Sequence, residues 1–301
     1  MPRTVHLILN PAAGKGRAGR QLRHVVEELH RSGWTVQEYV TARSMHAADI
    51  ARALPDDGAP VCVAGGDGTT NEVINGLPPH AHPVGLLPLG TGNDFAHMLG
   101  IHRMRDTLDA LDSHARRGVD AMEVHIIDED EQVLTRRVIN AVGIGFDAAV
   151  AIDVSRRLLG RGILPYLLSV LRVLRHYSSV PSVTVLQNRE IASLLFLACI
   201  GNGTSSGGGF RLTPHAQVDD GLLDLCHVRD VSIARVLQVL PRALKGTHLS
   251  APEVTYAQMT HVDIALDFPL PVHVDGEIAS SQARRVIVSC LPGSYDFYCR
   301  S

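Results

Sequence analysis

The sequence predicts an open α/β domain in three layers, followed by an antiparallel β-sandwich domain with a few helices. Three observations support this fold class. Short apolar runs alternate with helical patterns in the first third of the chain, which indicates a parallel sheet covered by helices. Near Gly118 this alternation gives way to closely spaced strand-like runs with turn signals between them. A length of 301 residues suits two domains, and we expect them at 1–120 and 121–291. The sequence does not decide whether the tail 292–301 packs on the first domain.

Strands and helices are expected to alternate along the first domain. Val5–Leu9 is a mostly apolar run and predicts a buried strand. Arg17–Arg31 places its apolar residues at helical spacing, and Gly33 ends that helix. The other expected strands are Thr35–Val40, Val61–Ala64 and Val84–Leu89, and the other expected helices are Ala47–Leu54, one that begins at Thr69–Asn75 and a short one at Asp94–Leu99.

Strand-like runs dominate the second domain, with two long helical stretches between them. Such a series of short strands is typical of an antiparallel sandwich or barrel. The expected strands are Val119–Ile127, Val133–Val142, Val183–Gln187, Leu194–Ile200, Leu222–Val228, Val262–Ala265, Val272–Val274 and Val286–Leu291.

Composition narrows the class of protein. Hydrophobic residues make up 45% and charged residues 20%, so disorder and coiled coils are excluded. A net charge of −3 argues against nucleic-acid binding. The longest apolar run is about ten residues, half of what a transmembrane helix needs, and no signal peptide is recognisable. The five cysteines form no C-x-x-C pair. We therefore expect a cytoplasmic protein with peripheral access to membranes, and the sequence leaves a homodimer open.

Three strands of the first domain end in loops of glycine and polar residues. These loops are Asn10–Gly16, Gly65–Glu72 and Pro88–Phe95. Ligands of open α/β sheets bind beyond the carboxyl ends of the strands, so the loops indicate one crevice. Glycines let the backbone approach a ligand, and the helices that follow offer N–H groups to phosphate. Asp67 would repel a bare phosphate, and its expected role is to hold Mg²⁺ or a water bound to Mg²⁺.

Gly14–Gly19 also fits the dinucleotide-binding pattern G-x-G-x-x-G, with Glu38 about twenty residues further on. A dinucleotide-binding oxidoreductase is therefore an alternative. That alternative leaves the Gly65–Thr69 loop without a role, and a single G-x-G-x-x-G match is a weak signal.

Taken together and in order, these blocks resemble the diacylglycerol kinase catalytic domain, and in particular the bacterial lipid kinases of the YegS/DgkB type. The resemblance covers nearly the whole chain. Ala13, Met45 and His97 depart from residues that are common in the family. The matching blocks are Asn10-Pro11 with Gly14, Gly65–Thr69 with Asn71-Glu72, Pro88–Thr91 with Asn93–Ala96, Asn140–Ala148, Asn202, Gly207–Gly209, Pro214, Asp219–Asp224 and Asp275-Gly276-Glu277.

The resemblance implies an ATP-dependent kinase that phosphorylates the hydroxyl of diacylglycerol or a related lipid alcohol. Asp67 and Asp94 should organise the phosphates and Mg²⁺. Asp275 or Glu277 should act as acid–base group from the second, lipid-binding domain, and the sequence does not choose between them. The resemblance places a structural Mg²⁺ on the carbonyls of Gln217 and Leu222 and the carboxylate of Asp220, an oxygen set that suits a hard cation. ATP should contact Asn10, Pro11, Ala12, Ala13, Gly14, Thr41, Gly66, Asp67, Gly68, Thr69, Thr70, Asn71, Glu72, Thr91 and Asp94.

The sequence leaves two further alternative functions open. An NAD kinase shares the Gly-Gly-Asp-Gly block, but Gly143–Ala148 and Gly207–Gly209 argue against it. A non-catalytic lipid-binding protein would have no need of the carboxylates. Asp275-Gly276 by itself predicts only a hairpin turn.

The segment Arg156–His176 combines five arginines and no acidic residue with many leucines. It predicts either a helix on an anionic membrane or a core-facing helix with solvated arginines.

Overall fold

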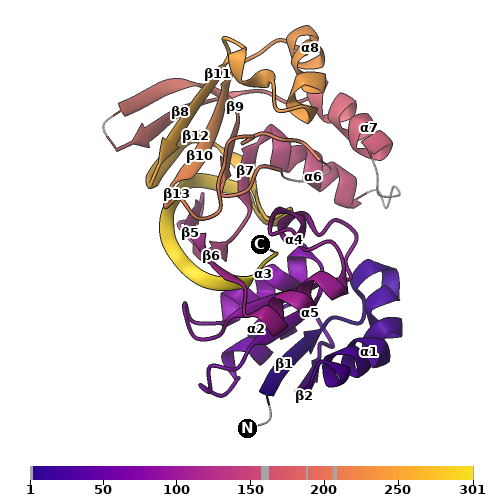
Figure 1. Cartoon of the computed structure of the whole chain (residues 1–301). Coiled ribbons are helices and arrows are strands. Elements are labelled where there is room, and N and C mark those ends of the chain that lie inside the picture. Colours follow the sequence, from indigo (N-terminus) through magenta and orange to yellow (C-terminus); the bar gives the residue numbers. More distant parts are fainter. Residues whose placement is uncertain (1–2, 157–162, 188, 206–208, 301) are drawn as a thin grey trace. The chain divides into compact units, whose positions relative to one another are not determined.

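The chain forms two compact units. The computed structural model describes residues 3–156, 163–187, 189–205 and 209–300. Unit 1 comprises Met1–Ala121 and Pro292–Ser301, and unit 2 comprises Met122–Leu291. The chain passes from one unit to the other within two strands, β5 (Arg116–Asp128) and β13 (Glu277–Tyr298) (Figure 1).

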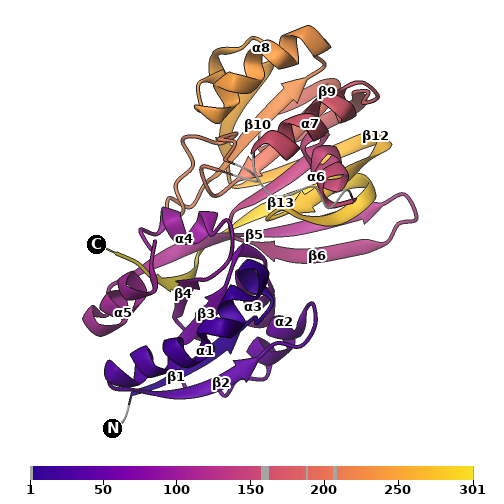
Figure 2. The ribbon, with the colours of Figure 1, turned by 90° about the vertical axis from the view of Figure 1, so that its right-hand side faces the viewer.

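Unit 1 contains a parallel sheet with the strand order β4-β3-β1-β2 (Figure 2). The end of β13 continues this sheet, because Phe297 pairs with Val84 of β4 in parallel register. Parallel strands need crossover connections, which helices supply here. The mixed α/β class expected for this part of the chain is confirmed. The strands are β1 (Arg3–Leu9), β2 (Trp34–Val40), β3 (Val61–Gly65) and β4 (Val84–Pro88).

Three helices of unit 1, α1, α3 and α4, begin in the loops that carry the glycine motifs. In α1 the regular helix starts at Arg17, because residues 14–16 have positive φ angles. Helix α3 starts at Asp67, two residues before the expected start. Helix α5 was not expected from the sequence; its apolar residues pack with those of α1 against β1. The helices are α1 (Ala13–Arg31), α2 (His46–Arg52), α3 (Asp67–Gly76), α4 (Asp94–Met98) and α5 (Met104–Ser113).

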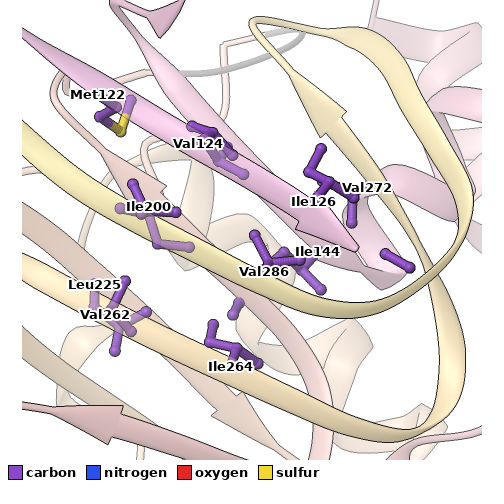
Figure 3. Packing of buried hydrophobic residues seen from close by; sticks show 14 of the residues in the cluster. Met122, Val124, Ile126, Ile144, Ile200, Leu225, Val262, Ile264, Val272 and Val286 are labelled. Carbon is purple, nitrogen blue, oxygen red and sulfur yellow. The ribbon is translucent and has the colours of Figure 1, made fainter. Parts of the chain in front are cut away.

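Unit 2 is built on antiparallel strands, as expected. The main strand order is β11-β10-β9-β7-β12-β13; β8 pairs with both β9 and β12, and β5 pairs with β13 and β6. Alternate residues of these strands meet in one apolar core, which includes Val124, Ile200, Val262 and Val286 (Figure 3). The strands not yet given are β6 (Val133–Val138), β7 (Ala141–Gly145), β8 (Val180–Leu186), β9 (Arg189–Gly201), β10 (Leu223–Arg229), β11 (Val254–Met259) and β12 (His261–Val274).

In the part of unit 2 that the structure describes, three α-helices accompany the strands, where the sequence indicated two: α6 (Phe146–Arg156), α7 (Ile163–Leu174) and α8 (Ile233–Leu244). A short 3₁₀ helix, His248–Ser250, follows α8. Side chains of all three α-helices share an apolar cluster with β9. Among the described residues, no helix has the length and apolarity that crossing a membrane would require.

Several strand boundaries in unit 2 differ from the expected ones. Strands β9 and β13 begin at Arg189 and Glu277, whereas Leu194 and Val286 were expected. The run Val133–Val142 was expected as one strand, but it divides into β6 and β7. The division has a physical reason, because the backbone N–H groups of Ile139, Asn140 and Ala141 donate to the carboxylate of Asp275. Two expected strands merge into β12, whose pairing with β13 shifts register around Leu270. Strand β11 was not expected.

Candidate active site

The glycine loops that follow β3 and β4 touch each other in unit 1. A Cβ atom added to Gly90 would lie 2.4 Å from the Cα of Gly66 and 2.6 Å from the Oδ1 of Asn93. A Cβ atom added to Gly65 would lie 2.6 Å from the side chain of Thr69. Contacts this short leave no room for a side chain, so the sequence needs glycine for the two loops to meet.

The loop after β1 joins the other two. The Nδ2 group of Asn10 donates to the Oγ1 of Thr69 at 3.0 Å, and the Oδ1 of Asn10 accepts from the N–H of Ala12 at 3.0 Å. A Cβ atom on Gly14 would lie 2.3 Å from the carbonyl oxygen of Leu89. Arg17 fixes the start of α1 to the third loop, since its Nη2 donates to the carbonyl of Gly90 at 2.8 Å.

Asp67 connects α3 to the start of α4. Its Oδ1 accepts from the N–H of Phe95 at 3.2 Å, and its Oδ2 accepts from the N–H of Asp94 at 3.3 Å. Burial, with the nearby charge of Asp67, raises the pKa of Asp94 above its ordinary value. A carboxylate has about four acceptor positions, so Asp67 keeps capacity for further ligands. Two carboxylates this close to the glycine loops suit a hard cation.

Other predicted contacts of the nucleotide surround these loops. Thr41 is buried, and its N–H donates to the carbonyl of Leu9 at 2.9 Å. The Oγ1 of Thr70 donates to the carbonyl of Gly66 at 3.3 Å. Glu72 points toward α2, where its Oε2 accepts from the N–H of Ala47 at 3.1 Å. Pro11 and Ala12 precede α1, which Ala13 begins; Gly68 and the buried Asn71 lie in α3, and Thr91 is exposed.

Asn93 belongs to this site although it was not among the expected contacts. It has a φ of +59°, is buried, and lines a small pocket together with Gly66 and Asp67. Its Nδ2 donates to the carbonyl of Gly90 at 3.3 Å. Within the described part of the chain its Oδ1 has no hydrogen-bond partner. A buried acceptor in this state is costly unless a ligand or water satisfies it. The one sequence feature that could have indicated Asn93 is its position in the third glycine loop, Pro88–Phe95.

Asp275 lies in unit 2, at the two-residue turn between β12 and β13. Its carboxylate accepts from the N–H groups of Ile139, Asn140 and Ala141 at 3.4, 3.0 and 2.9 Å. Its own N–H donates to the carbonyl of Ala141 at 2.8 Å. The side chain therefore holds the junction of β6 and β7.

Glu277 follows that turn and begins β13, where it pairs with Val274. Its side chain is exposed. Asp275 and Gly276 have φ angles of +47° and +83°, as two-residue hairpins require. The turn therefore directs the carboxylate of Asp275 toward the backbone of residues 139–141 and leaves Glu277 exposed.

A pair formed by the buried His273 and the partly buried Asp147 adjoins this turn, and it was not predicted. The Nε2 of His273 lies 2.7 Å from the Oδ2 of Asp147 in the first turn of α6. Only glycine fits beneath the pair, because a Cβ atom on Gly143 would lie 2.1 Å from that Nε2. Burial opposes the charged imidazole, but the charge and hydrogen bond of Asp147, with the charge of Asp275, raise the pKa of His273. The two partners are 126 residues apart in the sequence, so no local pattern could indicate them.

The expected structural Mg²⁺ site lies in the turn before β10. Gln217 and Asp220 are exposed there, and the Oδ1 of Asp220 accepts from the N–H of Leu222 at 3.0 Å. Burial, with the charge of Asp220, raises the pKa of the nearby Asp224. An oxygen-only turn with this concentration of negative charge fits a hard cation. No group of three or more His, Cys, Asp or Glu side chains that could hold a metal occurs among the described residues.

Two expected features extend beyond the described residues. Gly207 and Gly208 lie outside them, as does the stretch 157–162 of the arginine-rich segment Arg156–His176. The rest of that segment contains α7. Leu168 and Leu171 of α7 are exposed, and the Nη1 of Arg172 lies 2.6 Å from the Oδ2 of Asp153 in α6.

Comparisons with known proteins agree with the motifs. The family model of the diacylglycerol kinase catalytic domain matches residues 4–126. The model of the YegS C-terminal NAD kinase beta sandwich-like domain matches residues 140–298. The chain is 29% identical over 282 residues to a diacylglycerol kinase of Staphylococcus carnosus, covering 92% of this chain and 89% of that protein.

Two further comparisons extend this result. A YegS-like lipid kinase of Chromohalobacter salexigens is 32% identical over 283 residues, which cover 90% of this chain and 86% of that protein. The crystal structure of a diacylglycerol kinase from Bacillus anthracis superposes with a TM-score of 0.72 and 20% identity, covering 99% of this chain and 97% of that one. The chain therefore belongs to the family of diacylglycerol kinases and YegS-like lipid kinases, which are phosphotransferases.

Proposed function

We propose that the protein is an ATP- and Mg²⁺-dependent lipid kinase, which transfers the γ-phosphate of ATP to a hydroxyl of diacylglycerol or a related lipid alcohol. The observation that carries this proposal is the meeting of Gly66 and Gly90 beside Asp67, at the carboxyl ends of adjacent parallel strands. That position is where open α/β sheets bind ligands. The NAD kinase alternative receives less support, because the model that matches the N-terminal part is a diacylglycerol kinase domain.

The glycine loops of unit 1 suit the phosphates of ATP. Helix α3 begins directly after Gly66, so its first N–H groups and the positive end of its dipole are available to an anion. The orphaned Oδ1 of Asn93 can accept a hydrogen bond from the nucleotide or from a water bound to it. The chain has only two lysines, so Mg²⁺, arginine side chains and backbone N–H groups would neutralise the phosphate charge.

Asp67 and Asp94 would hold Mg²⁺ with the phosphates. When bound, the ion supplies charge neutralisation for phosphoryl transfer. Asp67 also fixes the start of α4, so the same carboxylate that would bind the cation sets the position of the third loop. The turn of Gln217, Asp220 and Leu222 would hold a second, structural Mg²⁺.

Glu277 is our choice of general base in unit 2. In the transfer, the lipid hydroxyl oxygen forms a bond to the γ-phosphorus while the bond from that phosphorus to the bridging oxygen breaks, and ADP leaves with the electron pair. The hydroxyl proton passes to a carboxylate. Three backbone N–H groups already occupy Asp275, whereas Glu277 is exposed. Asp275 would then act as a positioning residue that fixes the turn carrying Glu277.

Transfer of radiolabelled γ-phosphate from ATP to a panel of acceptors tests the proposal. The panel contains diacylglycerol, phosphatidylglycerol, sphingosine and NAD, each with Mg²⁺ and with EDTA. We expect labelled lipid only with Mg²⁺, and loss of turnover in Asp67→Asn with an unchanged circular dichroism spectrum. Absence of every lipid product would contradict the proposal, and labelled NADP in its place would establish the NAD kinase alternative.

Peripheral membrane binding would bring the enzyme to its lipid. The exposed apolar side chains Leu168 and Leu171 lie on α7, and Arg175 and His176 follow directly after it. A helix with exposed leucines and neighbouring positive charge suits an anionic surface. We expect co-sedimentation with phosphatidylglycerol vesicles that weakens in high salt and in Leu171→Glu. Binding that neither salt nor this variant changes would contradict membrane binding through α7.

A further inference from the structure

A buried imidazole that no step of the reaction above uses lies directly before the turn that carries the acid–base residues. His273 pairs with Gly143 of β7 on one side and with Ile278 of β13 on the other. Its neighbours Val272 and Val274 belong to the apolar core of unit 2. Successive side chains of a strand point to opposite faces, so the imidazole points away from that core, to the face on which α6 packs.

One hydrogen bond holds this imidazole to α6. The Nε2 of His273 lies 2.7 Å from the Oδ2 of Asp147, in the first turn of the helix, where the positive end of the helix dipole favours a carboxylate. The Nδ1 of His273 is buried and has no hydrogen-bond partner among the described residues. The ring has room because β7 has Gly143 at this point. The pair therefore links α6 to the last residues of β12.

The imidazole is the group of this cluster that changes its charge most readily. Burial opposes its charged form, but the charge and hydrogen bond of Asp147 and the charge of Asp275 outweigh burial and raise the pKa of His273 above 6.5. Burial and the charge of Asp147 also raise the pKa values of the thiols of Cys199 on β9 and Cys226 on β10, which stay neutral. The residues of β7 and β13 that pair with His273 carry no titratable group.

The charge of His273 bears on the turn through two carboxylates. A protonated imidazole attracts both Asp147 and Asp275, and a hydrogen bond between charged groups is roughly twice as strong as a neutral one. A neutral imidazole leaves the two carboxylates without a cation beside them. The carboxylate of Asp275 also accepts the three N–H groups that fix the turn before Glu277. The position of Glu277 should therefore depend on the proton of His273.

We propose that the His273–Asp147 pair is a positioning device for the general base: it holds β12 to α6 so that the turn presents Glu277 to the lipid hydroxyl, and it does so fully only while His273 is protonated. This inference rests on the proposed lipid kinase function. A misplacement of about 1 Å can lower a rate about 10²-fold. As the pH rises through the raised pKa of His273, the proton is lost, so kcat should fall on the alkaline side.

The titration of His273 can be followed by NMR on the full chain, without ATP, Mg²⁺ or lipid. Its imidazole signal is the one that His273→Gln lacks. We expect this signal to titrate above pH 6.5, and the backbone amide of Gly276 to shift with the same midpoint. In Asp147→Asn the midpoint should fall, because the charge that favours the imidazolium is gone. An unchanged midpoint in Asp147→Asn, or a Gly276 amide that does not follow the imidazole, would overturn the proposal.

Phosphate transfer to diacylglycerol, measured from about pH 6 to 9, tests the effect on rate. In the wild type, kcat should fall on the alkaline side with the midpoint found by NMR. His273→Gln should lower kcat about tenfold or more, leave KM for the lipid unchanged and remove the alkaline fall, because glutamine has no proton to lose. His261→Gln is the control on the same strand, since His261 is exposed and contacts Ser289; it should keep the kcat and pH profile of the wild type.

A second variant covers a loss of stability in His273→Gln. Asp147 is partly exposed, and Asp147→Asn keeps the shape of the side chain; its alkaline fall should move to lower pH together with the imidazole midpoint. Equal kcat and an equal alkaline fall in the wild type and a folded His273→Gln would remove the positioning role alone. No transfer to lipid at any pH would remove the kinase function, whereas a common midpoint for His273 and Gly276 would keep the link between the pair and the turn.

Discussion

Carboxylates of this protein serve as ties between backbone segments. Asp67 accepts two N–H groups at the start of α4, and Asp275 accepts three at the junction of β6 and β7. Hydrogen bonds to an ionised acceptor are roughly twice as strong as neutral ones. Removing such a side chain therefore disturbs the loop that it holds as well as any chemistry. Isosteric amides are better probes of these positions than alanine.

Asp275→Asn and Glu277→Gln should differ in their effects. Asp275→Asn weakens three partly buried hydrogen bonds and should cost about 1–3 kcal/mol of unfolding free energy. Glu277→Gln changes an exposed residue and should leave stability unchanged while lowering kcat about 10²- to 10⁴-fold. Thermal melts and lipid phosphorylation rates measure the two effects. A fully active Glu277→Gln would remove that residue from the role of base.

His227 on β10 should make the protein sensitive to acid. It is 1% exposed, and burial lowers its pKa from 6.5 to about 4. Below pH 6.5 the unfolded chain takes up a proton that the folded chain refuses, so stability falls between pH 6.5 and 4, by up to about 3 kcal/mol. His227→Gln should flatten this part of the profile. Urea denaturation across this pH range measures it, and identical slopes for the two proteins would exclude His227 as the cause.

At the scale of elements, glycines set how closely loops approach. Gly66 and Gly90 allow the loops after β3 and β4 to touch, and Gly143 allows His273 and Asp147 to lie over β7. In each case the neighbouring atom is backbone or a buried side chain, which has little freedom to move. These positions should therefore tolerate alanine poorly, whatever the reaction.

Gly90→Ala should separate the two loops. Its methyl group would meet the Cα of Gly66 at 2.4 Å, and overpacking of this kind typically costs about 1–3 kcal/mol. We expect ATP affinity to fall about tenfold or more, measured by isothermal titration calorimetry. Gly118→Ala is the control, because its methyl group would make only ordinary contacts, the nearest at 3.8 Å. Equal ATP affinity in Gly90→Ala and the wild type would contradict the importance of this contact.

Local patterns made part of the structure predictable from the sequence. Alternating apolar runs and helical spacing revealed the α/β class, and β1 to β4 lie within one or two residues of their expected bounds. The break between β6 and β7 was not predictable, because it depends on Asp275, 135 residues from Asn140. The two expected strands that merge into β12 are separated by Pro269 and Pro271, which disfavour regular strand pairing and lie where the pairing with β13 is irregular.

The candidate site likewise contains residues that could be predicted from the sequence and residues that could not. Gly66, Asp67 and Gly90 lie in short glycine motifs, which can be read locally. His273 and Asp147 were missed because their contact joins β12 to α6. An apolar pocket of unit 2, lined by Phe146, Phe196 and Leu240 among others, was missed for a similar reason, since its wall comes from helices and strands spread over more than a hundred residues. Tertiary packing, rather than local sequence, creates both.

At the scale of the whole molecule, unit 1 is assembled from both ends of the chain. Tyr295, Phe297 and Tyr298 of β13 are almost completely buried in it. The Oη of Tyr295 donates to the carbonyls of Ile74 and Leu77 at 3.0 and 3.2 Å, at the end of α3. A fragment that ends at Ala121 would therefore lack part of its own core.

Phe297→Ala should weaken ATP binding, although Phe297 lies near the C-terminal end of the sequence. The ring of Phe297 meets that of Phe95 edge-on, with centroids 5.1 Å apart, and the N–H of Phe95 donates to Asp67. Removing a buried phenylalanine side chain typically costs about 3–5 kcal/mol. We expect that loss of stability and weaker ATP binding, because the segment that holds Asp67 loses its packing partner.

Trp34 measures this effect directly, since it is the only tryptophan in the chain and is buried in unit 1. Its fluorescence in a urea titration should show a lower midpoint for Phe297→Ala. Ile278→Ala is the control on the same strand, because Ile278 lies in unit 2 and is 40% exposed; it should change stability by no more than about 0.5 kcal/mol. If Phe297→Ala unfolds at the wild-type midpoint, the end of β13 is dispensable for unit 1, and the nucleotide site depends on the first 121 residues alone.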